Sequence, residues 1–302
     1  MKFIDLSDLE QLTTIPKFSS IPNLERLNLG GCTSFHKFHS SIGIEMKYLR
    51  ELHLHGTGIK ELPKGIGYLE SLEILDLSKC SKFEKFPDIL ANLGHLRKLH
   101  LHESGIKELP SSIGYLELLE ILDLSNCSEF EKFPEIQGNM KWLEELYLRN
   151  TAIKELPNSI GSLRALQKLY LENTSIKELP STIGCLEVLK TLVLSRCSNF
   201  GKLPEIQRNM GSLCDLCLNQ TAIKELPYYI GHLTTLQRLY LEKCKNLRSL
   251  PSSICGLKSL KHLFLNGCSN LEALVEIMED MKHLQYLHLH DRNGNNRAVI
   301  TN

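Results

Sequence analysis

The chain has 302 residues, and its 35 basic and 35 acidic side chains give a formal net charge of zero. This balance excludes the strong positive field typical of proteins that bind nucleic acid or anionic membranes. No apolar run approaches the ~20 residues of a membrane span. The opening "MKFIDLSDLE" carries acidic residues where a signal peptide has its apolar stretch. We therefore expect a partner that is recognised through local surface features.

A degenerate repeat opens the chain over residues 1–23, with Ile4 and Leu6 in the apolar positions of a strand. Solenoid ends normally need polar caps, and these residues offer an apolar layer without one. We therefore expect the chain to be a fragment whose first flank is covered by a preceding domain, and to self-associate when it is expressed alone.

Repeats of 23 to 25 residues, about twelve of them, follow over residues 24–290. Each begins with the pattern L-x-x-L-x-L, and fixed-period self-similarity indicates one stacked solenoid rather than several globular domains. The first leucines are Leu24, Leu49, Leu72, Leu96, Leu119, Leu143, Leu166, Leu189, Leu213, Leu236, Leu260 and Leu284.

Two kinds of repeat share this frame and explain why IKELP occurs five times, at spacings of 47, 47, 23 and 47 residues. The kind with IKELP places Thr or Ser eight residues after its first leucine, and the other kind places Cys there and is usually one residue longer. The Thr kind has Thr57, Ser104, Thr151, Thr174 and Thr221, and the Cys kind has Cys32, Cys80, Cys127, Cys197, Cys244 and Cys268.

Each repeat predicts one short strand, because the leucines of x-L-x-L-x alternate with residues that point the other way. The proline that ends IKELP removes a backbone donor, so the return segment is neither a continuous helix nor a central strand. Chain direction repeats, so the strands are parallel. We predict an α/β solenoid: a leucine-rich-repeat horseshoe with a parallel β-sheet on its concave face and irregular or short helical convex turns, closed by a polar tail over residues 291–302.

The residue patterns of the two repeat kinds are more specific to one family than the repeat length is. "LxxLxLxxTxIKELPxxIGxL" alternating with "LxxLxLxxCSxFxxFPEIxxNMxxL" resembles the repeat domain of plant intracellular immune receptors of the TIR-NB-LRR type, and the likeness covers nearly the whole chain. The family's TIR domain and nucleotide-binding P-loop have no counterpart here, since no G-x-x-x-x-G-K-[ST] is present. The resemblance implies recognition of pathogen proteins and restraint of the receptor's own nucleotide-binding domain.

The cysteines suggest redox chemistry only weakly. Cys214 and Cys217 have the C-x-x-C spacing, but an offset of three along an extended segment points the two side chains to opposite faces. The turn cysteines are expected to be buried thiols. Cys244 and Cys268 are expected about one strand spacing apart, yet reduced, as in a cytosolic protein.

Histidine pairs raise the question of a metal site. His53 and His55, His100 and His102, and His288 and His290 each share one face of a strand, and Asp76 is expected between His53 and His100. Such a column can hold zinc. Residues 49–95 and 96–142 are near duplicates, however, so copying of the framework explains the same histidines without a ligand. We predict no metal ion. The N-glycosylation sequons at Asn126, Asn173 and Asn219 do not indicate glycosylation, because a secretory signal is missing.

The exposed strand positions are where binding is expected. The middle positions are Asn28, His53, Asp76, His100, Asp123, Tyr147, Tyr170, Val193, Cys217, Tyr240, Phe264 and His288, with aromatic residues gathered in the second half. Tyr and Arg are typical of interface hot spots, although aromatic residues also favour strands for structural reasons alone. The candidate partner-binding residues are Tyr147, Arg149, Tyr170, Glu172, Arg238, Tyr240, Glu242 and Phe264.

No acid–base pair or nucleophile stands out, so we predict a non-enzymatic module without cofactor. The expected partner is a protein: a pathogen effector, a guarded host protein or the receptor's own nucleotide-binding domain, with no nucleic acid and no membrane. The expected location is the cytoplasm, or also the nucleus. The alternative is a free-standing intracellular scaffold of the Ras-group type, which shares the "LPxxI" turns. An extracellular receptor ectodomain ranks third, because the motif "N-x-L-x-G-x-I-P" of plant extracellular repeats is missing.

Overall fold

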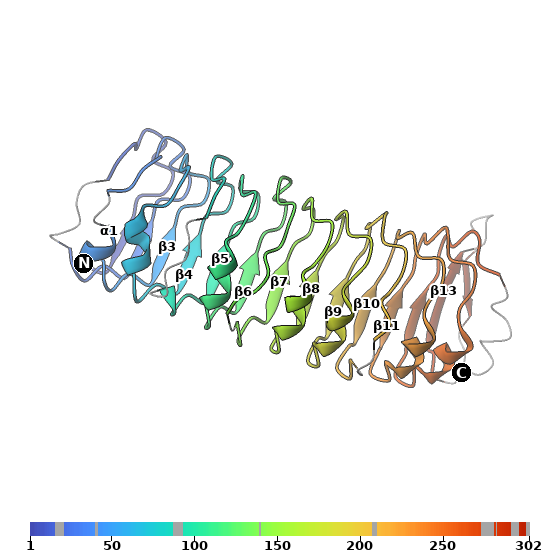
Figure 1. Cartoon of the computed structure of the whole chain (residues 1–302). Coiled ribbons are helices and arrows are strands. Elements are labelled where there is room, and N and C mark those ends of the chain that lie inside the picture. Colours follow the sequence, from blue (N-terminus) through green and yellow to red (C-terminus); the bar gives the residue numbers. More distant parts are fainter. Residues whose placement is uncertain are drawn as a thin grey trace. The chain divides into compact units, whose positions relative to one another are not determined.

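The computed structural model of the chain describes residues 1–15, 21–39, 42–86, 93–138, 140–206, 210–272, 281, 283–290 and 296–299. It divides into two compact units, unit 1 over Met1–Ala152 and unit 2 over Ile153–Asn302. Figure 1 shows that strands and connecting turns alternate along the chain in both units. Each unit is therefore considered by itself.

Unit 1 contains strands β1 to β7, and each strand pairs in parallel with the next one along the chain. The strands are β1 (Phe3–Asp5), β2 (Arg26–Asn28), β3 (Glu51–His53), β4 (Ile74–Asp76), β5 (Lys98–His100), β6 (Ile121–Asp123) and β7 (Glu145–Tyr147). The half-buried Ile4 pairs with Leu27, so the degenerate first repeat contributes a strand to the same sheet.

Unit 2 continues the same pattern, with parallel pairing from β8 through β13. Its strands are β8 (Lys168–Tyr170), β9 (Thr191–Val193), β10 (Asp215–Cys217), β11 (Arg238–Tyr240), β12 (His262–Phe264), β13 (Tyr286–His290) and β14 (Asn296–Val299). Strand β14 pairs with β13 in the antiparallel sense. It lies within the segment that the sequence suggests as a polar tail.

The leucines of the strands form the core of each unit. Leu146 and Leu148 in unit 1, and Leu169 and Leu171 in unit 2, are fully buried, as predicted. Because side chains alternate along a strand, the residues between the leucines lie on the opposite side of the sheet. We call that side the open face. The predicted architecture of parallel strands joined by irregular and short helical turns is confirmed.

A tight turn follows each of the strands β2 to β12 and has a left-handed residue directly before the Thr, Ser or Cys position. In unit 2, for example, φ is +53° at Asn173 and +57° at Lys243. Directly after Asn173, the Thr174 hydroxyl donates a hydrogen bond to the carbonyl of Leu171 at 2.9 Å. The thiol of Cys197, one repeat later, donates a hydrogen bond to the same carbonyl at 3.0 Å. The turn residues thus satisfy backbone acceptors inside the stack.

Short 3-10 helices follow the prolines that end the IKELP segments, and also Pro251, as expected for a residue that fixes φ and lacks an N–H. They are η1 (Lys64–Tyr68), η3 (Ser111–Tyr115), η4 (Asn158–Ser162), η5 (Ser181–Cys185), η6 (Tyr228–His232) and η7 (Ser252–Gly256). One α-helical turn, α1 (Ile42–Glu45), takes this place in an early repeat. Within the described ranges, the helices are too short or too polar to cross a membrane.

Candidate protein-binding surface

The open face of unit 2 carries a ladder of stacked rings on strands β11 to β13. Tyr240 and Phe264 are register partners, with ring centroids 4.5 Å apart and planes inclined by 6°. Phe264 and His288 continue the stack at 4.2 Å and 8°. Parallel strands lie ~4.8 Å apart, so equivalent rings on consecutive strands meet face to face. We call Tyr240, Phe264 and His288 the ring ladder.

A second, shorter stack runs beside the ring ladder, at the first positions of β12 and β13. His262 and Tyr286 have ring centroids 4.7 Å apart and planes inclined by 8°. His262 also lies 6.1 Å from Phe264, so the two stacks touch. Tyr286 is 49% exposed, whereas the ladder residues are half-buried. The result is a contiguous aromatic surface in which most ring faces are covered by other rings.

Charged and amide side chains border this aromatic surface. Arg238 holds the Asp215 carboxylate through two hydrogen bonds, one of which joins its Nη2 to Oδ2 at 2.6 Å. Beyond the carboxyl ends of the strands, the side chain of Asn219 accepts a hydrogen bond from the backbone N–H of Glu242 at 2.7 Å. The Glu242 carboxylate in turn accepts one from Asn266 Nδ2 at 2.8 Å. These contacts join neighbouring repeats and hold both borders in place.

The structure brings together four of the predicted site residues in unit 2: Arg238, Tyr240 and Phe264 on the adjacent strands β11 and β12, and Glu242 in the turn after β11. Tyr170 and Glu172 also lie on the open face of unit 2, at β8. Tyr147 and the exposed Arg149 belong to unit 1, where the Tyr147 phenol donates a hydrogen bond to Glu145.

Two expectations about exposure need correction. Tyr147 and Tyr170 are half-buried rather than fully exposed. Val193 is only 7% exposed, although it occupies a middle position of the open face. Its side chain is short, and its register partners on either side are Tyr170 and Cys217. A short side chain beside the larger ring of Tyr170 can be shielded, which strand alternation alone does not predict.

His262, Tyr286 and His288 are not among the binding residues predicted from the sequence, although all three belong to the aromatic surface. The repeat alignment could have identified them, because each occupies the same strand position as an aromatic or charged residue one repeat away. The side chain of His290 lies outside the described residues.

The thiols on and near the open face are not activated. Burial, together with the charges of Asp215 and Glu172, raises the pKa of Cys217 to about 12. A thiol with such a pKa carries little thiolate near neutral pH, and the thiolate is the reactive form. The turn cysteines are buried as expected, except that Cys268 is half-buried. All ten cysteines are free thiols, Cys244 among them.

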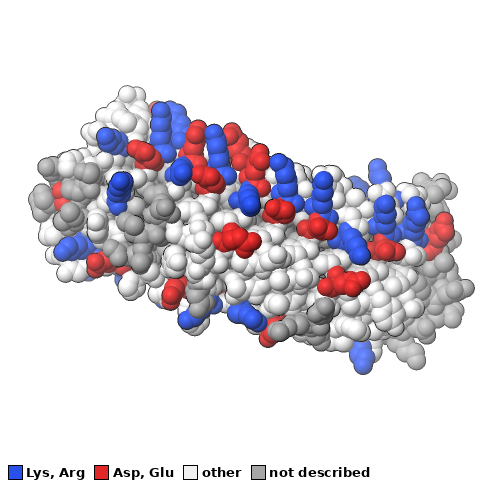
Figure 2. All heavy atoms as spheres, in the orientation of Figure 1, with Lys and Arg blue, Asp and Glu red and all other residues white. Residues whose placement is uncertain are grey.

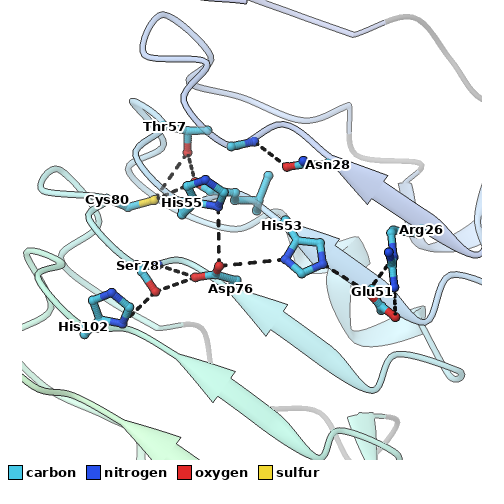
Figure 3. Close-up of polar contacts among 12 residues, drawn as sticks. Arg26, Asn28, Glu51, His53, His55, Thr57, Asp76, Ser78, Cys80 and His102 are labelled. Atoms are coloured by element: carbon cyan, nitrogen blue, oxygen red, sulfur yellow. Dashed lines mark hydrogen bonds and ion pairs between the residues drawn. The ribbon is translucent and has the colours of Figure 1, made fainter. Parts of the chain in front are cut away.

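A polar cluster occupies the open face of unit 1 (Figure 3), and Asp76 lies between His53 and His100 in the register, as predicted. Oδ2 of Asp76 lies 3.5 Å from His55 Nδ1 and 3.9 Å from His53 Nδ1. Its Oδ1 accepts hydrogen bonds from the backbone N–H and hydroxyl of Ser78. The carboxylate is therefore a shared acceptor for its neighbours.

Interaction with the Asp76 carboxylate raises the pKa of His53, although burial opposes the shift. For Asp76, burial acts to raise the pKa, but the attraction of His53 and the hydrogen bonds from Ser78 outweigh it and hold the pKa below its usual range. Burial lowers the pKa of His100. Within the described ranges, no group of three or more His, Cys, Asp or Glu side chains is placed to hold a metal ion.

Basic and acidic side chains lie intermixed on the face shown in Figure 2. In unit 1, for example, Lys107 lies 3.4 Å from Glu84 and 3.3 Å from Glu129, which belong to the repeats before and after it. Opposite charges thus neutralise each other from repeat to repeat. The aromatic surface of unit 2, rather than a charged patch, is the distinctive feature of the two open faces.

The comparison with protein families agrees with this geometry. The family model described as a leucine-rich repeat region matches residues 8–96, 135–220 and 215–301. The chain belongs to the leucine-rich repeat family.

Relatives of this leucine-rich repeat chain include plant disease resistance proteins. Disease resistance protein RPS4B of Arabidopsis thaliana is 31% identical over 111 residues, which are 31% of this chain and 10% of that protein. TMV resistance protein N of Nicotiana glutinosa is 36% identical over 94 residues, which are 31% of this chain and 8% of that protein. The predicted resemblance to the repeats of plant disease resistance receptors is confirmed, and the matches span only a small part of those relatives.

Among solved structures, a leucine-rich repeat protein of Leptospira interrogans matches with a TM-score of 0.63 and 28% identity. The match covers 95% of this chain and 84% of the other. This likeness supports the leucine-rich repeat fold.

Proposed function

We propose that this leucine-rich repeat chain is the protein-recognition and autoregulatory module of a plant disease resistance receptor. In this proposal it is non-catalytic and binds its protein partner on the open face of unit 2. The partner is a pathogen effector, a guarded host protein or the receptor's own nucleotide-binding domain, in the cytoplasm or nucleus.

The ring ladder is the observation that supports this proposal most directly. Tyr240, Phe264 and His288 are held in register by backbone pairing and by stacking at 4.2 to 4.5 Å. Rigid aromatic side chains lose little conformational entropy when a partner covers them, which makes them effective binding anchors. A parallel sheet built on buried leucines supplies the rigidity.

The disease resistance relatives also bear on the alternative of a free-standing scaffold. RPS4B and TMV resistance protein N carry the similar repeats as parts of much longer proteins. This favours the receptor module over the scaffold.

Proximity labelling in plant cells tests the proposal with a matched pair of variants. The ladder variant carries Tyr240→Thr and Phe264→Thr, because Thr retains strand propensity and already occupies a strand position at Thr191. The control is Tyr228→Thr, which removes an aromatic side chain that is 71% exposed on η6, away from the strands.

We expect a set of neighbouring proteins that the wild-type chain and the control both label and that the ladder variant loses. Urea unfolding of the purified variants verifies that both retain the fold. If a folded ladder variant labels the same proteins as the wild-type chain, the open face of unit 2 is not the binding surface.

A further inference from the structure

A groove of about 440 Å³ lies in unit 1, at the amino ends of strands β1 to β4. Its lining includes the four residues that directly precede these strands: Lys2, Glu25, Arg50 and Glu73. The backbone N–H groups of Glu25, Arg50 and Glu73 each donate a hydrogen bond of 2.8 Å to the carbonyl of the previous member of this row. Clefts of this size are typical of ligand sites. The groove therefore has room for side chains of a bound segment, on a backbone that is fixed in register.

The charges of this row are already paired within the protein. Lys2 Nζ lies 2.6 Å from Glu25 Oε1. Arg50 holds Glu73 Oε1 through two hydrogen bonds, from Nε at 2.9 Å and from Nη2 at 2.6 Å. These four side chains thus neutralise one another, and a ligand that used one of them would have to break an ion pair.

Two other lining residues, Tyr48 and Glu70, remain available to a ligand. Tyr48 is 59% exposed and directly precedes Leu49, which is fully buried and anchors the backbone at this point. Glu70 is exposed, and its carboxylate has no hydrogen bond or ion pair with any residue that the structure describes. Beside His95, the lining carries two basic and three acidic side chains. The excess negative charge of the groove therefore belongs to Glu70.

We propose that this groove binds a Lys or Arg side chain from an extended segment of a protein partner. The cation lies against the ring of Tyr48 and pairs with Glu70. The face of an aromatic ring attracts a cation because its quadrupole is negative there, and the methylene stem of the basic side chain covers apolar ring surface. The proposed function concerns the open face of unit 2, so this groove is a second binding site with its own partner chemistry.

Other ligand groups fit the groove less well. An acidic side chain, or a phosphate of a nucleic acid, is repelled by Glu70 and must compete with Glu25 and Glu73 for the two cations. An apolar side chain can cover Tyr48, but it removes water from the Glu70 carboxylate without replacing the lost hydrogen bonds. A basic side chain is the one group that satisfies both residues.

Peptide selection with a depletion step tests this inference. A random heptapeptide phage library is first depleted on the Tyr48→Leu/Glu70→Gln double variant and is then selected on the wild-type chain. The dissociation constants of the selected peptides are measured by fluorescence polarisation. We expect a shared Lys or Arg whose replacement by norleucine or citrulline weakens binding by roughly three- to thirtyfold.

Single variants locate the basic residue in the groove. Tyr48→Leu and Glu70→Gln should each weaken the parent peptide and leave the norleucine peptide unchanged, whereas Tyr48→Phe should retain affinity. Added salt should weaken binding to the wild-type chain more than binding to Glu70→Gln, because salt screens an exposed ion pair.

Two control variants in unit 1 remove the same kinds of side chain outside the groove lining. Tyr68→Leu removes a ring that is 52% exposed on η1, and Glu61→Gln removes the charge of an exposed turn residue. Both should bind the peptides as the wild-type chain does. The norleucine comparison uses the wild-type chain alone and does not depend on how well any variant folds.

Three results would overturn the inference. They are selected peptides that lack a basic residue, peptides that bind Glu70→Gln as tightly as the wild-type chain, and a failure to select any peptide that prefers the wild-type chain to the double variant. Acidic peptides would show instead that Lys2 and Arg50 release their carboxylates. None of these results bears on the proposed function, because the double variant retains the aromatic surface of unit 2.

Discussion

The hydroxyl of Thr174 lies 3.2 Å from the thiol of Cys197, one repeat later, and both groups share the carbonyl of Leu171 as acceptor. The same relationship joins Thr57 to Cys80 and Thr221 to Cys244. A Thr-kind repeat followed by a Cys-kind repeat therefore forms one polar unit inside the stack. This gives the alternation of the two repeat kinds a structural role.

Thr174→Val should lower the free energy of unfolding by ~0.5–1.5 kcal/mol, because it removes a buried hydrogen bond without changing the shape of the side chain. Thr182→Val is the matched control, since the Thr182 hydroxyl is buried and has no hydrogen-bond partner among the residues that the structure describes. Removing that hydroxyl should leave stability unchanged or increase it. Urea unfolding curves measure both values, and equal losses would contradict this account of the turn.

Stacking between Tyr240 and Phe264 should appear as a coupling energy in a double-mutant cycle. Leu replaces each residue singly and then both together, and we expect a coupling of ~0.5–1.5 kcal/mol in the free energy of unfolding. A second cycle that combines Tyr240→Leu with Tyr228→Leu should show no coupling, because Tyr228 lies on η6. A coupling near zero in the first cycle would mean that the rings stack without mutual stabilisation.

Gly231→Ala should destabilise unit 2, because a Cβ at this position would meet the backbone oxygen of Ser253 at 2.0 Å. Overpacking of this kind costs roughly 1–3 kcal/mol. Gly201→Ala provides the contrast, since no atom of the described residues lies within 4 Å of a Cβ at this position. Thermal unfolding should show a lower Tm for Gly231→Ala and an unchanged or higher Tm for Gly201→Ala. A reversed order would show that η6 and η7 can move apart at little cost.

Asp76→Asn should cost more stability near pH 6 than near pH 8. The raised pKa of His53 contributes stability that is fully present below the ordinary histidine pKa of ~6.5 and is lost as pH rises through the folded value. Asp76 also opposes the lowering of the His100 pKa, so its removal disfavours protonated His100 as well.

Urea unfolding at both pH values, with NMR titration of the histidines, measures the effect of Asp76→Asn. The pKa of His53 should fall in the variant. Glu61→Gln removes a carboxylate from an exposed turn residue and should cost the same at both pH values. A pH-independent loss in Asp76→Asn would show that its hydrogen bonds with Ser78, rather than the histidines, account for its contribution.

The sequence by itself determined strands β1 to β13, their parallel order and the leucines that form the core, but not the antiparallel strand β14. Leu169 and Leu171 are buried because a period of two places both on one side of the strand, and the proline in each turn excludes a long helix. A repeat of fixed length also brings equivalent residues together, which is why Asp76 could be placed between His53 and His100.

Only the tertiary structure decided which open-face side chains interact and how exposed they are. Val193 is buried and Tyr240 stacks on Phe264 because of neighbours one repeat away, whose side-chain conformations depend in turn on their own neighbours. Backbone periodicity sets where each Cβ lies, but it does not set the torsion angles beyond Cβ. The pairing of Arg238 with Asp215 is decided at that level.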